Sequence, residues 1–186
     1  MTTQEIRWHG RGGQGVVTAN EILAGAALRE GKYMKAFPEF GPERMGAPIR
    51  AFARVSDEPI KVHSQVYFPD FVIVLDPTLI GNVNVLEGMK PEGALVANYA
   101  EGTKHLREAL GTDMNVRAVN ATQIALETIG RPMANTAMLG ALVRISNVVK
   151  LESVMEELRQ KLGAKLPENV VEKNVMSVQR AYDEVD

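Results

Sequence analysis

Two periods of hydrophobicity divide the chain into strands and helices. Short apolar runs bounded by glycine, proline or polar residues are typical of strands, and longer stretches with an apolar residue every three to four positions are typical of amphipathic helices. Strands are expected at residues 5–9, 32–37, 49–55, 60–66, 71–75, 94–98 and 115–119. Helices are expected at 16–30, 103–110, 121–129, 135–149, 151–162 and 168–185.

The order of these elements predicts an α/β fold: a Rossmann-like three-layer sandwich with a mostly parallel sheet, an antiparallel hairpin and a helical C-terminal third. The strand at 5–9, the helix at 16–30 and the strand at 32–37 form a β-α-β unit, so we expect its two strands to pair in parallel. The continuous apolar run at 71–75 is typical of a parallel strand that is buried on both faces.

Three further expectations concern the pairing of strands, the C-terminal helices and the number of domains. Segments 49–55 and 60–66 flank a turn and predict the antiparallel hairpin. The helix at 135–149 has few polar positions, so it either lies in the core of the fold or packs against another chain. The length predicts a single domain that spans residues 1–186.

A glycine-rich loop lies between the first strand and the first helix, with the sequence Gly10-Arg11-Gly12-Gly13-Gln14-Gly15. It fits the letters G-x-G-x-x-G in the strand–loop–helix context that this pattern requires. Glycine lets a ligand approach the backbone, and the first amides of a helix lack intrahelical partners, so the loop predicts a site for a phosphate or carboxylate. Arg11 adds a cation that can bind such a group with two donors. The alternative is a tight turn whose glycines serve packing alone.

A second unusual loop follows the second strand. Residues 38–48 contain three prolines and two glycines in eleven positions, together with the charged residues Glu43 and Arg44. Loops that follow parallel strands lie at one edge of the sheet, so we expect this loop and the glycine loop to face one site. The alternative is an ordinary connector. Asp76, which follows the strand at 71–75, is expected to cap the next helical turn rather than to contact a ligand.

Composition limits the chemistry that the chain can perform. With 21 basic and 23 acidic residues the net charge is −2, and the absence of a basic run gives no reason to expect nucleic acid or a membrane as a partner. The sequence contains no cysteine, so the chain cannot itself bind an ordinary iron–sulfur cluster or use a thiol nucleophile. The three histidines are widely separated, and we expect strand-end or surface positions for them and no metal site. The N-terminal residues lack a basic leader and an apolar core, so we expect a cytoplasmic protein.

Three stretches together resemble the gamma subunit of the 2-oxoacid:ferredoxin oxidoreductases. They are Arg7-Trp8-His9-Gly10-Arg11-Gly12-Gly13-Gln14-Gly15-Val16-Val17-Thr18, then Ala36-Phe37-Pro38-Glu39-Phe40-Gly41-Pro42-Glu43-Arg44-Met45-Gly46-Ala47-Pro48, then Asp76-Pro77-Thr78-Leu79. The resemblance covers nearly the whole chain in order and spacing. The second stretch is similar to that of the pyruvate and 2-oxoisovalerate members, and the 2-oxoglutarate type has a different second loop.

The resemblance implies a multisubunit enzyme that oxidatively decarboxylates a 2-oxoacid with coenzyme A, giving acyl-CoA, carbon dioxide and reduced ferredoxin. Thiamine diphosphate and [4Fe–4S] clusters would lie on partner subunits of alpha, beta and delta type. This chain would have no catalytic residue of its own and would be inactive alone, with coenzyme A as the anionic ligand that it contacts. The candidate cofactor-binding residues are Gly10, Arg11, Gly12, Gly13, Gln14, Gly15, Glu43 and Arg44.

Two other interpretations remain open from the sequence. A stand-alone dinucleotide-binding domain would place an acidic residue at the end of the second strand, about 20 residues past the glycine loop. Here that strand ends in Ala36-Phe37-Pro38, which argues against NAD. A purely structural scaffold subunit that contacts no ligand would tolerate substitutions in the glycine loop except where assembly fails.

Overall fold

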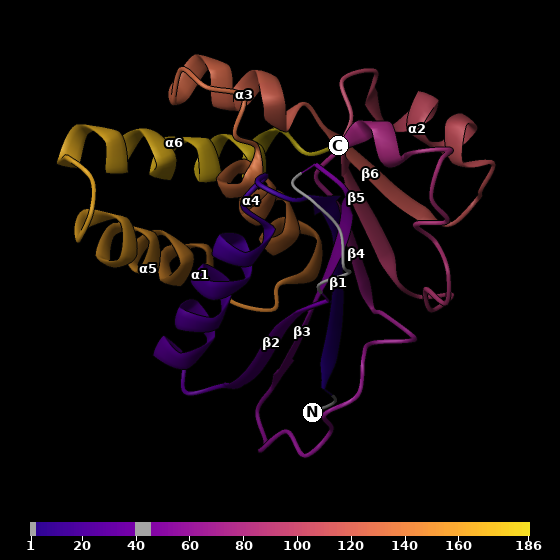
Figure 1. The fold of residues 1–186 in the computed structure, drawn as a ribbon, viewed down its shortest axis with the longest axis horizontal. Coiled ribbons are helices and arrows are strands. Elements are labelled where there is room, and N and C mark those ends of the chain that lie inside the picture. Colours follow the sequence, from indigo (N-terminus) through magenta and orange to yellow (C-terminus); the bar gives the residue numbers. More distant parts are fainter. Residues whose placement is uncertain (1–2, 40–45) are drawn as a thin grey trace.

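The computed structural model describes residues 3–39 and 46–186. Their strands are β1 (Gln4–Arg11), β2 (Tyr33–Glu39), β3 (Pro48–Ser56), β4 (Phe71–Val74), β5 (Ala94–Asn98) and β6 (Asn115–Val119). Their helices are α1 (Val16–Arg29), α2 (Gly102–Leu110), α3 (Ala121–Thr128), α4 (Asn135–Ser146), α5 (Leu151–Gly163) and α6 (Glu168–Glu184), with a single 3₁₀ turn, η1, at Pro77–Leu79. The expected α/β class and the helical C-terminal third are confirmed (Figure 1).

The described strands form one mixed sheet in the order β2-β3-β1-β4-β5-β6. The pairs β1–β4, β4–β5 and β5–β6 are parallel. The pairs β1–β3 and β2–β3 are antiparallel. The central parallel strands β4 and β5 are short and apolar because both of their faces are covered, as expected from the run at 71–75.

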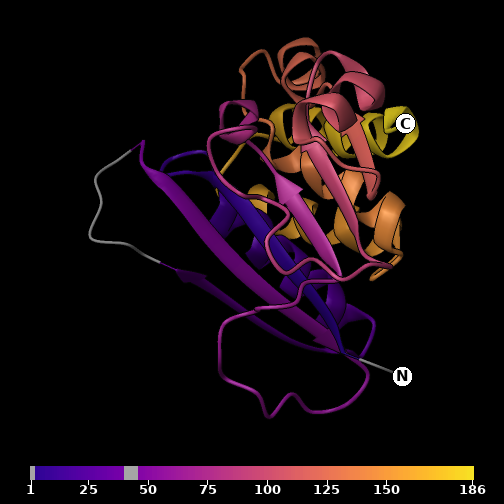
Figure 2. The same cartoon turned by 90° about the vertical axis from the view of Figure 1, so that its right-hand side faces the viewer.

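Two strand predictions were wrong. β2 does not pair with β1, because β3 lies between them and is antiparallel to both. Residues 60–66 form no strand, so the predicted hairpin of 49–55 with 60–66 is absent and the antiparallel hairpin is β2–β3 instead. Residues 57–70 form an irregular excursion at one end of the sheet, visible as the long purple loop in Figure 2. The alternation of apolar and polar residues could not reveal that β3 inserts between β1 and β2. A strand shows the same period of two whichever neighbour it pairs with.

The helices cover the two faces of the sheet unequally. On one face α1 packs on β1, β2 and β3, and α4 packs on β4 and β5, with α3, α5 and α6 stacked outside them (Figure 1). This face holds the larger apolar cluster, which includes Trp8, Ile73 and Leu139. On the other face α2 and the connection after β4 cover a smaller cluster around Val72 and Leu95. The arrangement is the expected three-layer sandwich.

Helix α4 lies inside the fold. Nine consecutive residues, 135–143, are buried, and the helix packs between the sheet and α6. At Gly140 a Cβ atom would lie 2.0 Å from the carbonyl oxygen of Val178, so only glycine allows α4 and α6 to approach this closely. The core interpretation of this helix is therefore confirmed. Its buried apolar side chains pack within the chain.

Among the described residues no helix is long and apolar enough to cross a membrane.

Candidate functional site

The glycine loop, residues 10–15, joins β1 to α1 and depends on two glycines for its shape. Gly15 has φ of 80° and precedes the first turn of α1. A Cβ atom at Gly15 would lie 2.4 Å from Nδ2 of Asn135 on α4, and one at Gly10 would lie 2.7 Å from Cγ2 of Val16. Because Cβ atoms do not tolerate such short contacts, a side chain at either position would force α1 away from its neighbours.

The N-terminus of α1 carries no cap. Gly15 offers no side-chain acceptor, and the first turn contains no acidic residue. The first backbone bond of the helix runs from the amide of Ala19 to the carbonyl of Gly15, at 3.0 Å. Among the described residues no backbone acceptor faces the amides of Val16, Val17 and Thr18. Unpaired amides at the positive end of a helix dipole favour an anion. The anion-binding role of the loop stays a prediction that this geometry allows.

Asp76 fixes the glycine loop from the neighbouring strand. It follows β4 and caps η1, because its Oδ1 accepts a hydrogen bond from the Thr78 amide at 2.9 Å. Its Oδ2 accepts from Nε2 of Gln14 at 2.6 Å and from Nε of Arg11 at 3.1 Å. Burial alone would raise the pKa of Asp76, but the hydrogen bonds from Thr78 and Gln14 and the charge of Arg11 hold that pKa below its ordinary value. The expected capping role is confirmed, and the same carboxylate also orients two side chains of the loop.

The two predicted loops meet through Arg11 and Gly12. The Arg11 guanidinium donates to the carbonyl of Gly46 at 3.1 Å and to Oγ1 of Thr78 at 2.9 Å. The Gly12 amide donates to the carbonyl of Ala47 at 3.1 Å. Residues 46 and 47 therefore lie beside the glycine loop, as expected. Each of the three guanidinium nitrogens of Arg11 donates a hydrogen bond within this chain. Arg11 therefore links the two loops in the absence of any ligand.

Glu43 and Arg44, the two candidates from the second loop, lie outside the described residues.

A pocket of about 170 Å³ opens beside the glycine loop. Its lining comes from the loop, the ends of β4 and β5 and the linker before α4: Gly13, Gln14, Leu75, Pro77, Asn98, Thr122, Pro132, Met133 and Ala134. The chain leaves β1 toward α1 on one face and leaves β4 toward η1 and the smaller cluster on the other. The pocket therefore lies near a topological switch point, where open α/β sheets bind their ligands.

Asn98 and Thr122 are residues of this pocket that the sequence reasoning missed. Asn98 donates to the Leu75 carbonyl at 3.0 Å and to Oγ1 of Thr122 at 2.8 Å, and it accepts from the Thr122 amide at 3.1 Å. These bonds tie the end of β5 to β4 and to the start of α3. The signal was available, because Asn98 is the last residue of a predicted parallel strand and so lies at the same edge as the two loops.

A buried polar pair precedes the glycine loop on β1. Nε of Arg7 donates to Nε2 of His9 at 3.0 Å, and both residues are buried. Burial, helped by the positive charges of Arg7 and Arg50, lowers the pKa of His9 to about 3. His9 is therefore neutral near pH 7 and accepts a hydrogen bond. His9 lies near the end of β1, as expected, but it is buried and not at the surface. In the described part of the chain no group of three His, Asp or Glu side chains is suited to a metal ion.

Comparison with known proteins agrees with the resemblance of the three sequence stretches. The family model for pyruvate ferredoxin/flavodoxin oxidoreductase matches residues 5–184. The pyruvate synthase subunit PorC of Thermotoga maritima is 45% identical over 181 residues, which cover 97% of this chain and 94% of that protein. The pyruvate/ketoisovalerate oxidoreductases common subunit gamma of Thermococcus kodakarensis is 47% identical over 180 residues, covering 96% and 95%.

The fold has a matching solved structure. The crystal structure of the pyruvate oxidoreductase subunit PORC from Thermotoga maritima superposes with a TM-score of 0.88 at 41% identity, covering 100% of this chain and 98% of that one. Matches of this extent include the glycine loop, the Asp76 turn and the helical C-terminal third together. The chain therefore belongs to the pyruvate ferredoxin/flavodoxin oxidoreductase family.

Proposed function

We propose that this chain is the gamma subunit of a multisubunit pyruvate or 2-oxoisovalerate:ferredoxin oxidoreductase. The enzyme oxidatively decarboxylates a 2-oxoacid with coenzyme A to acyl-CoA and carbon dioxide, and passes the electrons to ferredoxin. The observation that carries the proposal is the match to gamma subunits and PorC subunits, which covers almost the full length of this chain and of each relative. The name of the Thermococcus relative assigns one gamma subunit to both pyruvate and ketoisovalerate enzymes. We infer that the choice between these substrates rests with the other subunits.

The cofactors of electron transfer and decarboxylation belong, in this proposal, to partner subunits of alpha, beta and delta type. A chain without cysteine has no thiolate ligand for a [4Fe–4S] cluster. Thiamine diphosphate, when bound on a partner, supplies the carbanion chemistry. The assembly is cytoplasmic. The contribution of this chain is a rigid α/β body whose glycine loop and second loop border the shared site.

Coenzyme A is the ligand that best suits the edge of the sheet at the glycine loop. Its phosphates need donors, and the uncapped amides at the start of α1 supply them beside Gly13, the exposed glycine of the loop. The pocket beside Gln14 and Met133 offers partly apolar space next to those amides. The residues that would hold the ligand are Gly10 to Gly15, with Glu43 and Arg44 from the second loop as sequence-based candidates.

A structural role for Arg11 is the competing interpretation, and its three internal hydrogen bonds favour it. Two variants separate the roles: Arg11→Ala, and Arg107→Ala on α2 as a control of the same charge change at an exposed position. If the loop binds coenzyme A, R11A raises the apparent KM for coenzyme A about tenfold in the assembled enzyme, as expected for the loss of one charge-assisted contact. An unchanged KM with a reduced yield of complex would make Arg11 an assembly residue.

The assembly itself is tested by mild affinity purification of the tagged chain from its native host under anaerobic conditions. We expect stoichiometric partner chains with iron and thiamine diphosphate, and reduction of a viologen dye that depends on coenzyme A and on pyruvate or 2-oxoisovalerate. Recovery of the chain alone, without iron or thiamine, would refute the proposed function.

A further inference from the structure

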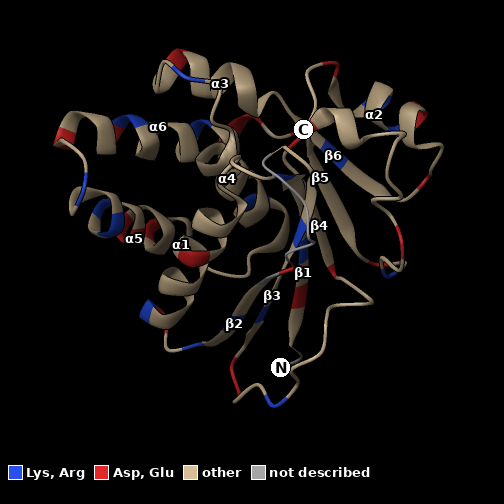
Figure 3. Cartoon of the chain, in the orientation of Figure 1, with Lys and Arg blue, Asp and Glu red and all other residues tan. Residues whose placement is uncertain are grey.

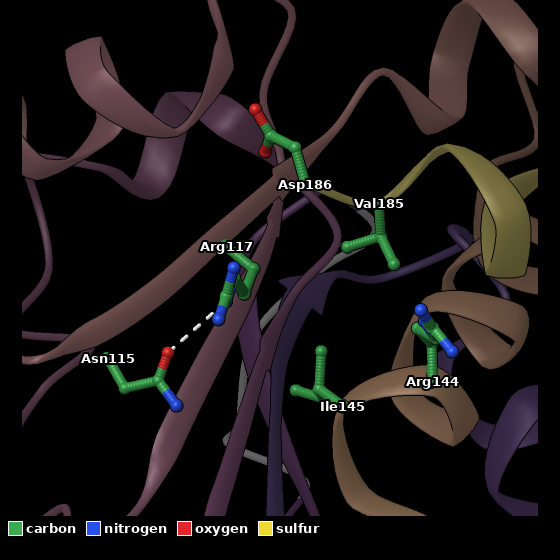
Figure 4. Close-up of a pocket in the computed structure, with 6 residues that line it drawn as sticks. All are labelled: Asn115, Arg117, Arg144, Ile145, Val185 and Asp186. Atoms are coloured by element: carbon green, nitrogen blue, oxygen red, sulfur yellow. Dashed lines mark hydrogen bonds between the residues drawn. The ribbon is translucent and has the colours of Figure 1, made fainter.

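A second pocket lies at the free edge of β6, at the end of α4 opposite to the glycine loop. It has a volume of about 310 Å³ and is lined by Asn115, Arg117, Arg144, Ile145, Val185 and Asp186. Figure 4 shows Asn115 and Arg117 on the β6 side and Arg144 on the α4 side, with Ile145 and Val185 between them. None of these residues belongs to the candidate site described above.

The segment after α6 closes the pocket against the edge of the sheet. The Asp186 amide donates to the Ala118 carbonyl of β6 at 3.3 Å, and the Ala118 amide donates to Oγ1 of Thr103 at 2.9 Å. Thr103 also donates to the carboxylate of Asp186. The one carboxylate side chain of the lining is therefore engaged with Thr103 at the start of α2.

Both arginines of the pocket are exposed and contact neutral groups. Nε of Arg117 donates to Oδ1 of Asn115 at 3.3 Å, which leaves its two terminal nitrogens for another acceptor. The Arg144 guanidinium lies over the ring of Tyr182, 5.3 Å from its centroid. Among the described residues neither arginine has an acidic partner within 4.0 Å, whereas Arg159 pairs with one glutamate and Arg180 with two.

We propose that this pocket binds a small polyanion whose two anionic groups span Arg117 and Arg144. Two guanidinium groups from different elements, oriented by an amide and by an aromatic ring, are suited to oxygen-rich anions because each presents parallel donors. The pocket is polar and small, so it takes a compact ligand and not an apolar segment of a protein. The shared chemistry is a pair of anionic groups on a short linker, which either a diphosphate or a dicarboxylate supplies.

The test uses the purified full chain, labelled for NMR, with pyrophosphate and malonate as separate probes and acetate as a probe with one anionic group. We expect saturable shifts of the amides of Arg117, Ile145 and Val185 with pyrophosphate or malonate, and much weaker shifts with acetate. Saturation by one of the two and not by the other identifies the source of the ligand. Reading these particular amides separates the pocket from any binding at the glycine loop.

Variants provide the control. Arg117→Ala and Arg144→Ala should each weaken binding at least about tenfold, as expected for the loss of a charge-assisted hydrogen bond. Arg107→Ala removes the same charge from an exposed position of α2 that does not line the pocket, and should change the affinity less than about twofold, because an exposed charge is screened. All three variants should melt at the same temperature as the parent. Shifts that do not saturate with either probe, or an equal loss in R107A, would overturn the proposal.

Discussion

The strands on the two sides of the β1–β4 junction carry different side chains on the face that α1 and α4 leave uncovered. In the parallel half, the positions on this face are aliphatic: Val72, Val74, Leu95, Ala97, Val116 and Ala118. In the antiparallel half they are charged or aromatic: Glu5, Arg7, His9, Lys35, Phe37, Glu39, Arg50, Phe52 and Arg54, as the registers of β1, β2 and β3 require. Figure 3 shows the same contrast, with β4 and β5 uncharged.

The difference follows from what covers each half. Helix α2 and apolar residues of the β4–β5 connection cover the parallel half, and a helix satisfies its own backbone. Irregular segments cover the antiparallel half, from residues 57–70 and from part of the same β4–β5 connection, and their carbonyl groups need donors. Arg54 supplies donors to the carbonyls of Ser64 and Gln65, at 2.6 and 2.9 Å. Arg7 does so for Val85 and Glu87, at 3.0 and 2.6 Å. The buried guanidinium groups of Arg7 and Arg54 thus hydrogen-bond irregular backbone segments to the antiparallel half of the sheet.

The largest effect is expected from a cavity in the parallel half. Leu95 on β5 is fully buried, and Leu95→Ala should lower the free energy of unfolding by about 3 kcal/mol through lost burial and an unfilled cavity. Urea denaturation followed by circular dichroism measures the change. A loss below about 1 kcal/mol would mean that the smaller cluster rearranges to fill the space.

Arg54 tests the corresponding attachment in the antiparallel half. Its side chain is 3% exposed and lies 2.7 Å from Glu5. Arg54→Met should lower the free energy of unfolding by about 2 to 3 kcal/mol, because Glu5 and two carbonyls lose their donor. Limited proteolysis should cleave the 57–70 segment faster in this variant. Arg50→Met is the control, since Arg50 is more exposed and its loss should cost about 0.5 kcal/mol.

His9 makes the antiparallel half sensitive to acid. With a folded-state pKa of about 3, His9 stays neutral where the unfolded chain, with its ordinary pKa near 6.5, takes up a proton. The contribution of neutral His9 to the free energy of unfolding is therefore fully present above about pH 6.5 and declines as the pH falls toward 3. Between pH 7 and pH 5 the free energy of unfolding decreases by about 2 kcal/mol. His9→Gln keeps an acceptor for Arg7 and should flatten denaturation midpoints across this interval. An equally steep curve in H9Q would assign the acid sensitivity to other groups.

Asp76, at the junction of the two halves, is expected to have a smaller effect on stability than Leu95, Arg54 or His9. Asp76→Asn replaces one acceptor oxygen by a donor that faces Thr78 or Gln14, and should cost about 1 kcal/mol. The loosened glycine loop should also show faster amide hydrogen exchange at Gln14, while exchange at Leu95 stays unchanged. Equal acceleration at both positions would indicate global destabilisation and no local role at the junction.

The sequence predicted most of the parallel half because its signals are local. The strands at 94–98 and 115–119 were found with their observed bounds, as the apolar run between turn residues defines each one. The glycine loop and the capping role of Asp76 were also found, since each depends on residues close in the chain.

The antiparallel half was predicted less well because its pairings depend on distant residues. Insertion of β3 between β1 and β2 is decided by the burial of Trp8, Ala51 and Ala53 under α1, which no short window contains. Residues 60–66 have strand-like composition, but Arg54 binds the carbonyls of this segment and holds it as coil. The sequence predicted that Arg11 binds an anion. Its hydrogen bonds to Asp76 and Gly46 join residues far apart in the chain, so only the three-dimensional structure reveals them.

The contact between Gly140 and the backbone of Val178 has a mechanical consequence. With no side chain between them, α4 and α6 touch backbone to backbone and have no compressible layer along which to slide. Asn135, at the first turn of α4, lies against Gly15, and Arg144, in its last turn, borders the pocket at β6. Helix α4 therefore acts as a strut between these two places.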